Sequence, residues 1–371
     1  MKILQISNHY YPHVGVIGQV AKDISNTFSK DQVKVFCLNH KKENSVETVD
    51  GVEVIKAGTY ARYVDQPYSF SYKKLLKRTF AEFKPDLVIF HCPNPFDARY
   101  VLKILKKYPE CKLVLFWHLD NQKGKYFARQ NNKLIKRAVK IIATSPNYIK
   151  GSKVLSKNAD KCKLIPLCIN NERSSVDEYV LNRSKVIRES AEGKTICFAC
   201  GKHVEHKGLE HLINASKLLS DDFTIFIAGN GPLTEDLKKQ ALGDNKIIFL
   251  GKISDEELKA YYTATDIFCF PSIDRGEAFG FALLEAMSFS KPTVTFNVPY
   301  SGINFVSVSG ITGIEVPNGD HREFAKAIKK LGTDKELREK YGKAAKERIN
   351  QNFTEEKFKQ NIKELIDEIK G

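Results

Sequence analysis

Long apolar runs are missing from this sequence of 371 residues. None approaches the roughly 18 consecutive apolar residues that a membrane-spanning helix needs. The beginning of the chain, MKILQISNHY, also lacks the apolar core and small-residue cleavage site of a secretory signal. We therefore expect a cytoplasmic protein that is neither secreted by a standard signal nor anchored by a transmembrane helix.

Cysteine is scarce and irregularly spaced, with eight residues along the chain. This pattern excludes a dense disulfide framework and is typical of a reducing compartment. Cys197 and Cys200 in TICFACG have the spacing of a redox or zinc motif. However, residues three apart in a strand point to opposite faces, and no second Cys/His pair follows at zinc-finger distance. We interpret both as core residues and expect no metal site.

Acidic residues are too few to balance the basic ones, so the formal net charge is +15. Such a charge favours an anionic partner, which could be nucleic acid, an anionic membrane or a phosphorylated substrate. No acidic residue lies between Asp120 and Asp160. Basic residues in that stretch follow helical spacing and predict one basic stripe, which faces either a partner or only water. They are Lys125, Arg129, Lys133, Arg137 and Lys140.

Short runs rich in Val, Ile and Phe alternate with amphipathic helical stretches. Most runs are continuously apolar, as expected for parallel strands covered on both faces. We expect strands at 2–7, 33–38, 52–58, 87–92, 112–118 and 140–145, then at 195–201, 223–229, 246–251, 266–272 and 292–297. The polar stretch 170–192 is the expected linker, part of it helical. The fold class is therefore α/β, with two Rossmann-like doubly wound domains at 1–175 and 176–371.

The loops after these strands are where we expect chemistry, because ligands of open parallel sheets bind beyond the carboxyl ends of the strands. The first such loop places Gly15 and Gly18 just before a helical stretch, and a helix start reached through glycine can bind an anion. The strand at 112–118 delivers His118 at its end.

Two loops in the second half carry paired charges. The loop GKHVEHKG contains Lys202 and Lys207, and the segment EAFGFALLEA carries Glu277 and Glu285 on an otherwise apolar background. Lysines neutralise phosphate oxygens, and carboxylates accept hydrogen bonds from vicinal hydroxyls. A substrate with a diphosphate and hydroxylated rings, such as a nucleotide-sugar, fits both pairs.

Five motifs, in this order, resemble the retaining glycosyltransferases of the GT-B fold, family 4: FWHLD, IIATSPNYIKGS, GKHVEHKG, AGNGPL and EAFGFALLEAMSFSKPTV. The resemblance covers nearly the whole chain. It implies two domains facing a cleft, with the last helix able to pack back on the first domain. It also implies hexose transfer from a UDP- or GDP-sugar to a glycan acceptor in cell-surface polysaccharide assembly. The acceptor is expected to be lipid-linked, so the protein would lie peripherally on the inner face of an anionic membrane.

The resemblance implies roles for residues of the EAFGFALLEA segment. Glu277 would bind the hydroxyls of the donor sugar, and Glu285 the hydroxyls of the ribose. The backbone N–H groups of Phe279 and Gly280 would face the diphosphate at a helix start.

Other roles follow from the same resemblance. Lys202 and Lys207 would neutralise the leaving diphosphate in place of a metal, consistent with the lack of an Asp-x-Asp motif and with no cofactor. His118 would contact the transferred sugar near the reacting carbon. Gly15 and Val16 would offer backbone N–H groups in the first loop. Val16 departs from the family, which has a second glycine there, and its branched side chain narrows that loop.

Several alternatives remain open from sequence. Glu285 could lie on a solvated helix face, His118 could be a hydrogen-bonded core histidine, and Lys202 could be a surface lysine where the family has arginine. A dinucleotide-dependent oxidoreductase is disfavoured because Thr234 replaces the third glycine of the fingerprint in AGNGPLTEDL. A sugar-nucleotide epimerase or hydrolase on the same architecture is closer. An anionic-polymer-binding protein is less favoured, and no nucleic-acid module is visible.

Overall fold

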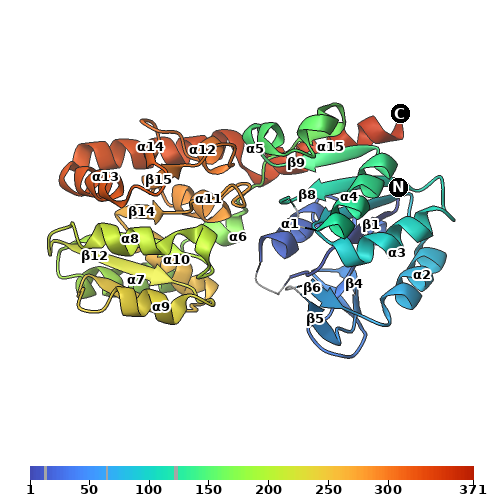
Figure 1. The fold of residues 1–371 in the computed structure, drawn as a ribbon, viewed down its shortest axis with the longest axis horizontal. Helices are drawn as coiled ribbons and strands as arrows, with labels where there is room; N and C mark the ends of the chain where they lie inside the picture. The colour runs from blue at the N-terminus through green and yellow to red at the C-terminus, as the bar shows by residue number, and fades with distance from the viewer. Residues whose placement is uncertain (12–14, 64–65, 121–123) are drawn as a thin grey trace. The chain divides into compact units, whose positions relative to one another are not determined.

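The computed structural model describes residues 1–11, 15–63, 66–120 and 124–371. The chain forms two compact units, each an α/β domain built on a parallel sheet (Figure 1). Unit 1 comprises Met1–Thr144, Ser152–Pro166 and Phe358–Gly371, and unit 2 comprises Ser145–Gly151 and Leu167–Lys357. No helix of the described residues is both long and apolar enough to cross a bilayer.

Among its described residues, unit 1 has an eight-stranded sheet in the order β10-β9-β8-β7-β1-β2-β4-β3, with only β3 antiparallel to its neighbour. The strand order reverses between β1 and β7, where ligands of doubly wound sheets bind. The strands are β1 (Ile3–Ile6), β2 (Val33–Leu38), β3 (Ser45–Val49), β4 (Val52–Ala57), β7 (Leu87–Cys92), β8 (Lys112–Trp117), β9 (Lys140–Ala143) and β10 (Cys162–Leu164), beside a small hairpin of β5 (Ala61–Tyr63) and β6 (Gln66–Tyr68).

Each of the first four helices of unit 1 comes after a strand in the sequence. They are α1 (Val16–Ser25), α2 (Tyr72–Phe83), α3 (Pro95–Leu105) and α4 (Lys125–Arg137). The last helix, α15 (Glu355–Lys370), contributes its residues from Phe358 onward to this unit. Its end is fixed by charge, because Glu368 pairs with Lys140 at 2.5 Å and with Lys163 at 3.1 Å.

Unit 2, all of whose residues are described, has a six-stranded parallel sheet in the order β13-β12-β11-β14-β15-β16. The strands are β11 (Thr195–Cys200), β12 (Phe223–Ala228), β13 (Ile247–Gly251), β14 (Ile267–Phe270), β15 (Thr293–Asn297) and β16 (Gly313–Pro317). The helices are α5 (Pro146–Gly151), α6 (Asn171–Ser174), α7 (Glu178–Ser190), α8 (Leu209–Ser216), α9 (Thr234–Gln240), α10 (Asp255–Ala264), α11 (Phe281–Ser288), α12 (Ile303–Val306), α13 (His321–Thr333) and α14 (Lys335–Asn352).

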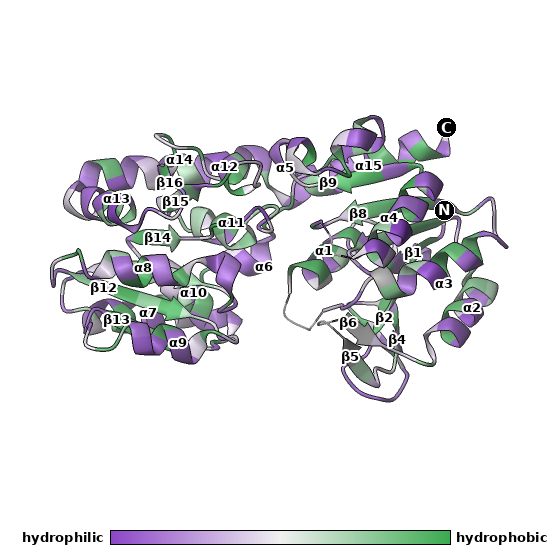
Figure 2. Ribbon diagram, in the orientation of Figure 1, coloured by the Kyte–Doolittle hydropathy of each residue, from purple (hydrophilic) through white to green (hydrophobic). Residues whose placement is uncertain are grey.

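All eleven strands expected from the sequence are confirmed, and the expected linker contains α6 and α7. The apolar runs were easy to recognise because most of their side chains are buried; β12, for example, is green along its length in Figure 2, whereas the helices alternate between purple and green. The pattern missed the short strands β5, β6 and β10, and also β3, whose exposed centre reads SVETV, and β16, which begins with glycine and ends with proline. Of these, β3, β10 and β16 lie at the edge of a large sheet, where burial no longer dictates apolar residues.

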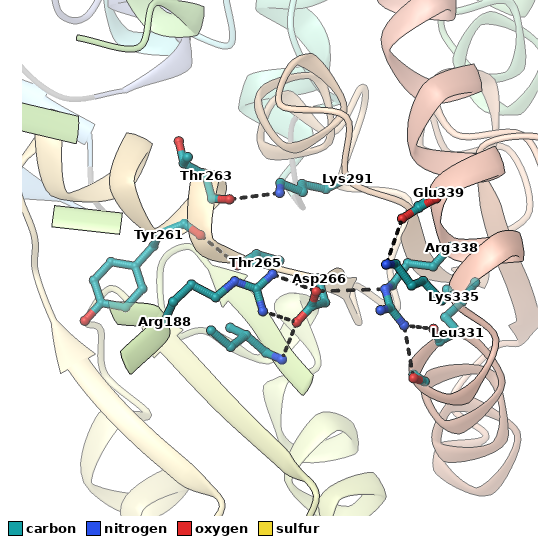
Figure 3. Close-up of polar contacts among 12 residues, drawn as sticks. Arg188, Tyr261, Thr263, Thr265, Asp266, Lys291, Leu331, Lys335, Arg338 and Glu339 are labelled. Carbon is teal, nitrogen blue, oxygen red and sulfur yellow. Dashed lines mark hydrogen bonds and ion pairs between the residues drawn. The ribbon is translucent and has the colours of Figure 1, made fainter. Parts of the chain in front are cut away.

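An ion-pair network lies at the amino ends of β11 and β14 in unit 2 (Figure 3). Asp266, directly before β14, binds both terminal nitrogens of Arg188 at 2.7 Å and accepts the backbone N–H of Ile196 at the start of β11. Arg338 of α14 lies 3.9 Å from the same carboxylate and donates to the carbonyls of Leu331 and Gly332. The network therefore ties α7, two strands and the α13–α14 turn together.

Beside this network, Lys291 donates to the Thr263 carbonyl at 2.9 Å, and burial lowers its pKa to about 8 (Figure 3). Burying the ammonium costs free energy, so Lys291→Met should raise the free energy of unfolding at pH 7 by on the order of 1–2 kcal/mol. Between pH 8 and 10.5 the unfolded chain binds more protons here than the folded chain. Stability of the parent should therefore gain from this group as pH rises through that window.

Urea unfolding at pH 7 and pH 10 checks this expectation. The exposed Lys329 on α13 supplies the matched control, Lys329→Met, which should change neither stability nor its pH dependence. A Lys291→Met protein less stable than that control at pH 7 would show that the hydrogen bond to Thr263 outweighs the burial cost.

Candidate functional site

The order of strands in unit 2 brings the two charged loops together. β11 and β14 are neighbours, although β12 and β13 lie between them in sequence, so the strand order reverses at this point. Lys202 and Lys207 follow β11, and Glu277 follows β14. Both loops leave the carboxyl edge of the sheet at the position where doubly wound folds bind ligands.

The lysine loop is held by close backbone packing. Gly208 has φ 59°, and a Cβ there would lie 2.2 Å from the Pro271 carbonyl oxygen, so only glycine fits. A Cβ on Gly229 would lie 1.9 Å from the Gly201 carbonyl oxygen, and one on Gly231 would lie 2.4 Å from that of His203. The AGNGPL glycines therefore let this turn pack on the lysine loop.

Thr234, where a dinucleotide fingerprint needs its third glycine, has a structural role. Its Oγ1 accepts the Gly231 N–H at 2.8 Å and lies 2.9 Å from Nδ1 of His203, which is fully buried. Among the described residues no group of three His, Cys, Asp or Glu side chains is arranged to hold a metal ion.

Lys207 and Glu277 form an ion pair in unit 2, with side chains only 20% and 14% exposed. The ammonium also lies 5.2 Å from the centre of the Phe270 ring. The Glu277 backbone is fixed as well, because its carbonyl accepts the Ser301 hydroxyl at 2.5 Å. The basic group assigned to the diphosphate and the carboxylate assigned to the sugar are therefore adjacent. Lys202, in contrast, is exposed.

Glu285 of α11 is buried, with 6% of its surface exposed, so the alternative of a solvated helix face is wrong. One carboxylate oxygen binds Arg173 at 2.5 Å, and the other accepts the Tyr262 hydroxyl at 3.1 Å. Burial raises the pKa of Glu285, and Arg173 opposes that shift. Arg173 therefore favours the ionised carboxylate, which is the form that accepts hydrogen bonds from a diol.

The start of α11 is shaped by glycine. Gly280 caps the helix at φ 90°, next to the buried Phe279. A Cβ on Gly302 would lie 2.0 Å from the Ala278 carbonyl oxygen, so this loop needs glycine as a neighbour. The positive end of the helix dipole and the backbone N–H groups of Phe279 and Gly280 thus lie between the two glutamates in sequence.

Cys200 and the Glu285 carboxylate both contact the Tyr262 hydroxyl. The Cys200 sulfur is 3.1 Å from the Tyr262 hydroxyl, and burial raises the pKa of the thiol to about 12. Cys197 is completely buried in β11. The interpretation as a core residue is confirmed for Cys197, whereas Cys200 is partly exposed.

His118 belongs to unit 1, directly after β8, and is 7% exposed. Its Nε2 lies 2.9 Å from Nδ1 of His91, whose Nε2 lies 3.1 Å from the Gln5 side-chain oxygen. Burial lowers the pKa of His118 well below its usual range, so the ring is neutral. Its burial fits the hydrogen-bonded core histidine considered above, and its position at a strand's carboxyl end fits a site residue.

The first loop of unit 1 differs in detail from the expectation. Gly15 precedes α1 and Val16 begins it, with 39% of the Val16 surface exposed. Gly18, expected before the helix, lies inside it, where a Cβ would approach the Tyr10 backbone to 3.3 Å. Gly18 therefore serves helix packing.

The predicted basic stripe is only partly exposed. Lys125, Arg129 and Lys133 are exposed on α4. Arg137 instead donates to the carbonyls of Pro109 and Cys111, at 3.0 and 2.6 Å, and Lys140 pairs with Glu368. The predicted stripe is therefore wrong for Lys140, which begins β9 and pairs with a carboxylate, and Arg137 is held by backbone carbonyls from elsewhere in the chain.

Sequence reasoning missed Arg173, Tyr262, His91 and Gln5. The two residues beside Glu285 gave no signal, since Arg173 lies in the polar linker and Tyr262 in an ordinary amphipathic helix. His91 and Gln5 gave one: each is a polar residue within a buried apolar strand, LVIFHC and ILQI. Such a residue needs a hydrogen-bond partner.

Comparison with known proteins gives matches in both units. Residues 17–173 match the family model described as Glycosyltransferase Family 4, and residues 182–348 match Glycosyl transferases group 1. O-antigen chain mannosyltransferase C of Escherichia coli is 27% identical over 363 residues, covering 95% of each chain. D-rhamnosyltransferase WbpZ of Pseudomonas aeruginosa is 29% identical over 365 residues, covering 95% of this chain and 92% of its own.

Solved structures match the fold. Sucrose-phosphate synthase from Thermosynechococcus elongatus superposes with a TM-score of 0.82 at 19% identity, covering 99% of this chain and 98% of its own. Anabaena HepE in complex with UDP superposes with a TM-score of 0.81 at 18% identity, covering 99% and 100%. At these identities the matches establish a shared two-domain architecture, which is the GT-B fold.

Proposed function

Because the chain belongs to the family 4 glycosyltransferases of the GT-B fold, we propose that it transfers a hexose from a UDP- or GDP-sugar to a glycan acceptor with retention of configuration. The observation that carries this proposal is the placement of Lys207, Glu277 and Glu285 around one switch point in unit 2. These groups match a diphosphate, a hexose and a ribose. The two relatives named above are a mannosyltransferase of O-antigen chains and a D-rhamnosyltransferase, which supports a role in polysaccharide assembly.

In the proposed reaction the acceptor hydroxyl attacks the anomeric carbon from the face that the diphosphate leaves. The bond between that carbon and the phosphate oxygen breaks, and the departing diphosphate takes the acceptor proton. Lys207, released from Glu277, stabilises the charge that develops on the leaving oxygen. Glu277 then binds hydroxyls of the sugar, Glu285 binds the ribose, and no metal ion is needed.

Incubation with a panel of UDP- and GDP-sugars and a lipid-linked oligosaccharide extract tests this function. We expect one donor to release nucleotide diphosphate together with a new glycosidic bond, whose NMR coupling shows the donor's anomeric configuration. Release of nucleotide without transfer would favour the hydrolase or epimerase alternative. An inverted linkage would contradict retention.

The exposed part of the basic stripe bears on the lipid-linked acceptor. A Lys or Arg near an anionic membrane contributes on the order of 1 kcal/mol, and this attraction fades within a Debye length of about 8 Å. Reversing Lys125, Arg129 and Lys133 to glutamate should therefore lower partitioning onto vesicles containing anionic lipid by at least about 100-fold and leave nucleotide affinity intact.

Co-sedimentation with vesicles measures this effect. The matched control reverses three exposed lysines of unit 2, Lys329, Lys340 and Lys343, and should bind vesicles much more tightly than the α4 variant. Equal binding of the α4 variant and the parent would mean that the stripe faces only water and that the acceptor is a soluble glycan.

A further inference from the structure

Three buried polar side chains of unit 1 form a continuous hydrogen-bonded chain behind His118. It runs from His118, after β8, through His91 of β7 to Gln5 of β1. His91 is 1% exposed and Gln5 is completely buried. A buried polar chain of this kind costs free energy unless every member is satisfied, so its proton positions are constrained.

The proton positions follow from the Gln5 amide. Its nitrogen donates to the Ala21 carbonyl at 2.9 Å and to the Ser25 hydroxyl at 2.7 Å, while that hydroxyl donates to Ala21. Both acceptors require the NH₂ group on that side, so the Gln5 carbonyl oxygen faces His91. The amide orientation is thereby fixed by α1.

The rest of the chain has one consistent assignment. A carbonyl oxygen can only accept, so His91 must donate to Gln5 from Nε2. In a neutral His91 ring Nδ1 then carries a lone pair, and it accepts from Nε2–H of His118. Burial lowers the pKa of His91 to about 3 and that of His118 well below its usual range, so both rings are neutral. His118 is left with an unprotonated Nδ1.

The hydrogen bonds fix the proton positions, and stacking on Phe116 fixes the orientation of the two histidine rings. Phe116 lies 4.5 Å from the His118 ring and 5.5 Å from the His91 ring, nearly parallel to both. Among the described residues the structure gives no hydrogen-bond partner to Nδ1 of His118. The ring is therefore held in place with one nitrogen committed to His91 and the other available.

We propose that Gln5 and His91 are positioning residues that hold His118 in the Nε2–H tautomer, so that its Nδ1 serves only as a hydrogen-bond acceptor for a hydroxyl of the transferred sugar. This inference rests on the proposed function for the identity of the ligand, but the tautomer itself does not. A sugar position that carries only an acceptor cannot satisfy His118. The hydrogen bonds from Gln5 through His91 therefore make His118 favour a sugar that carries a hydroxyl at the contacted position.

Nitrogen NMR of the ¹⁵N-histidine-labelled protein tests the tautomer directly. His118→Gln assigns the His118 signals, and we expect Nδ1 to resonate as a pyridine-type nitrogen and Nε2 as a pyrrole-type nitrogen. The opposite pattern in the parent overturns the proposal. Because this measurement needs no substrate, it stands even if every donor fails, and an inactive protein with the expected signals contradicts only the proposed function.

Two variants test the positioning role. Gln5→Leu removes the acceptor of His91, and His91→Phe removes the acceptor of His118 while keeping a ring beside Phe116. Each should mix the His118 tautomers and lower kcat at least tenfold, with a smaller change in KM for the donor. Thr79→Val, which removes a buried hydroxyl of α2 that bonds only within that helix, controls for general damage. Unchanged tautomer signals and kcat in a folded His91→Phe protein overturn the role.

A donor analogue supplies a third readout. Fluorine in place of the contacted hydroxyl cannot donate, so that deoxyfluoro donor should bind the parent at least tenfold more weakly than the natural donor. In His118→Gln, whose side chain can donate from its amide, this penalty should shrink. Equal penalties in both proteins at every ring position would contradict the acceptor role of His118.

Discussion

Replacing Lys207 with alanine should lower kcat by a factor of about 10² to 10³, because a preorganised charge on a developing oxyanion is worth several kcal/mol. The side chain is only 20% exposed, and Gly208 fixes the loop that carries it, so water replaces the lost charge poorly. Transfer by the parent should survive excess chelator, since the lysine supplies the charge that a metal would otherwise bring. Steady-state kinetics with the donor found by the panel measures both effects.

Two comparisons sharpen the Lys207 experiment. Lys202→Ala should lower kcat less than Lys207→Ala does, because Lys202 is exposed. Lys217 is another exposed lysine of unit 2, and Lys217→Ala should leave kcat unchanged. Loss of transfer activity in excess chelator, with recovery when magnesium or manganese is added, would contradict the metal-independent mechanism.

The two glutamates should separate in phenotype. Glu285→Gln should weaken binding of the donor and of the free nucleotide diphosphate together, by about 100-fold, because both contain the ribose. Glu277→Gln should abolish most transfer yet spare the free nucleotide, or even strengthen its binding, because Lys207 loses its ion-pair partner and can neutralise phosphate fully. Titration calorimetry with UDP or GDP compares the two variants. Equal loss of nucleotide affinity would contradict one carboxylate per ring.

Arg173 extends this test through pH. Burial raises the pKa of Glu285, and Arg173 is the nearest group that opposes the shift. Without Arg173 the carboxyl should hold its proton to higher pH, and a protonated carboxyl accepts ribose hydroxyls less well. Nucleotide affinity of Arg173→Ala should therefore fall as pH is lowered from 8 to 6 more steeply than in the parent, and Arg173→Lys should restore part of it.

Burial explains which features could be predicted from the sequence. Strands covered on both faces must be apolar, so β1, β7, β11 and β12 were recognisable from composition. Glu277 and Glu285 could be named because they are the charged residues of an otherwise apolar segment, and Lys207 because it follows a strand in a loop that resembles the family's phosphate loop; their roles stay predictions. Arg173 could not, because it contacts a residue 112 positions away through an ion pair that no local pattern encodes. Contacts with residues distant in sequence likewise bind Arg137 and Lys140, which the local spacing placed in the basic stripe.

The ion-pair network around Asp266 has a consequence for how this protein can evolve. It fastens the amino ends of β11 and β14 to α7 and α14, whereas the lysine loop and the glutamate segment leave the carboxyl ends of the same strands. Substitutions that break this network therefore act at the opposite edge of the sheet from the residues assigned to the donor. The sugar specificity could therefore change during evolution through side chains of the carboxyl-edge loops, while the Asp266 network and the glycines that shape those loops stay the same.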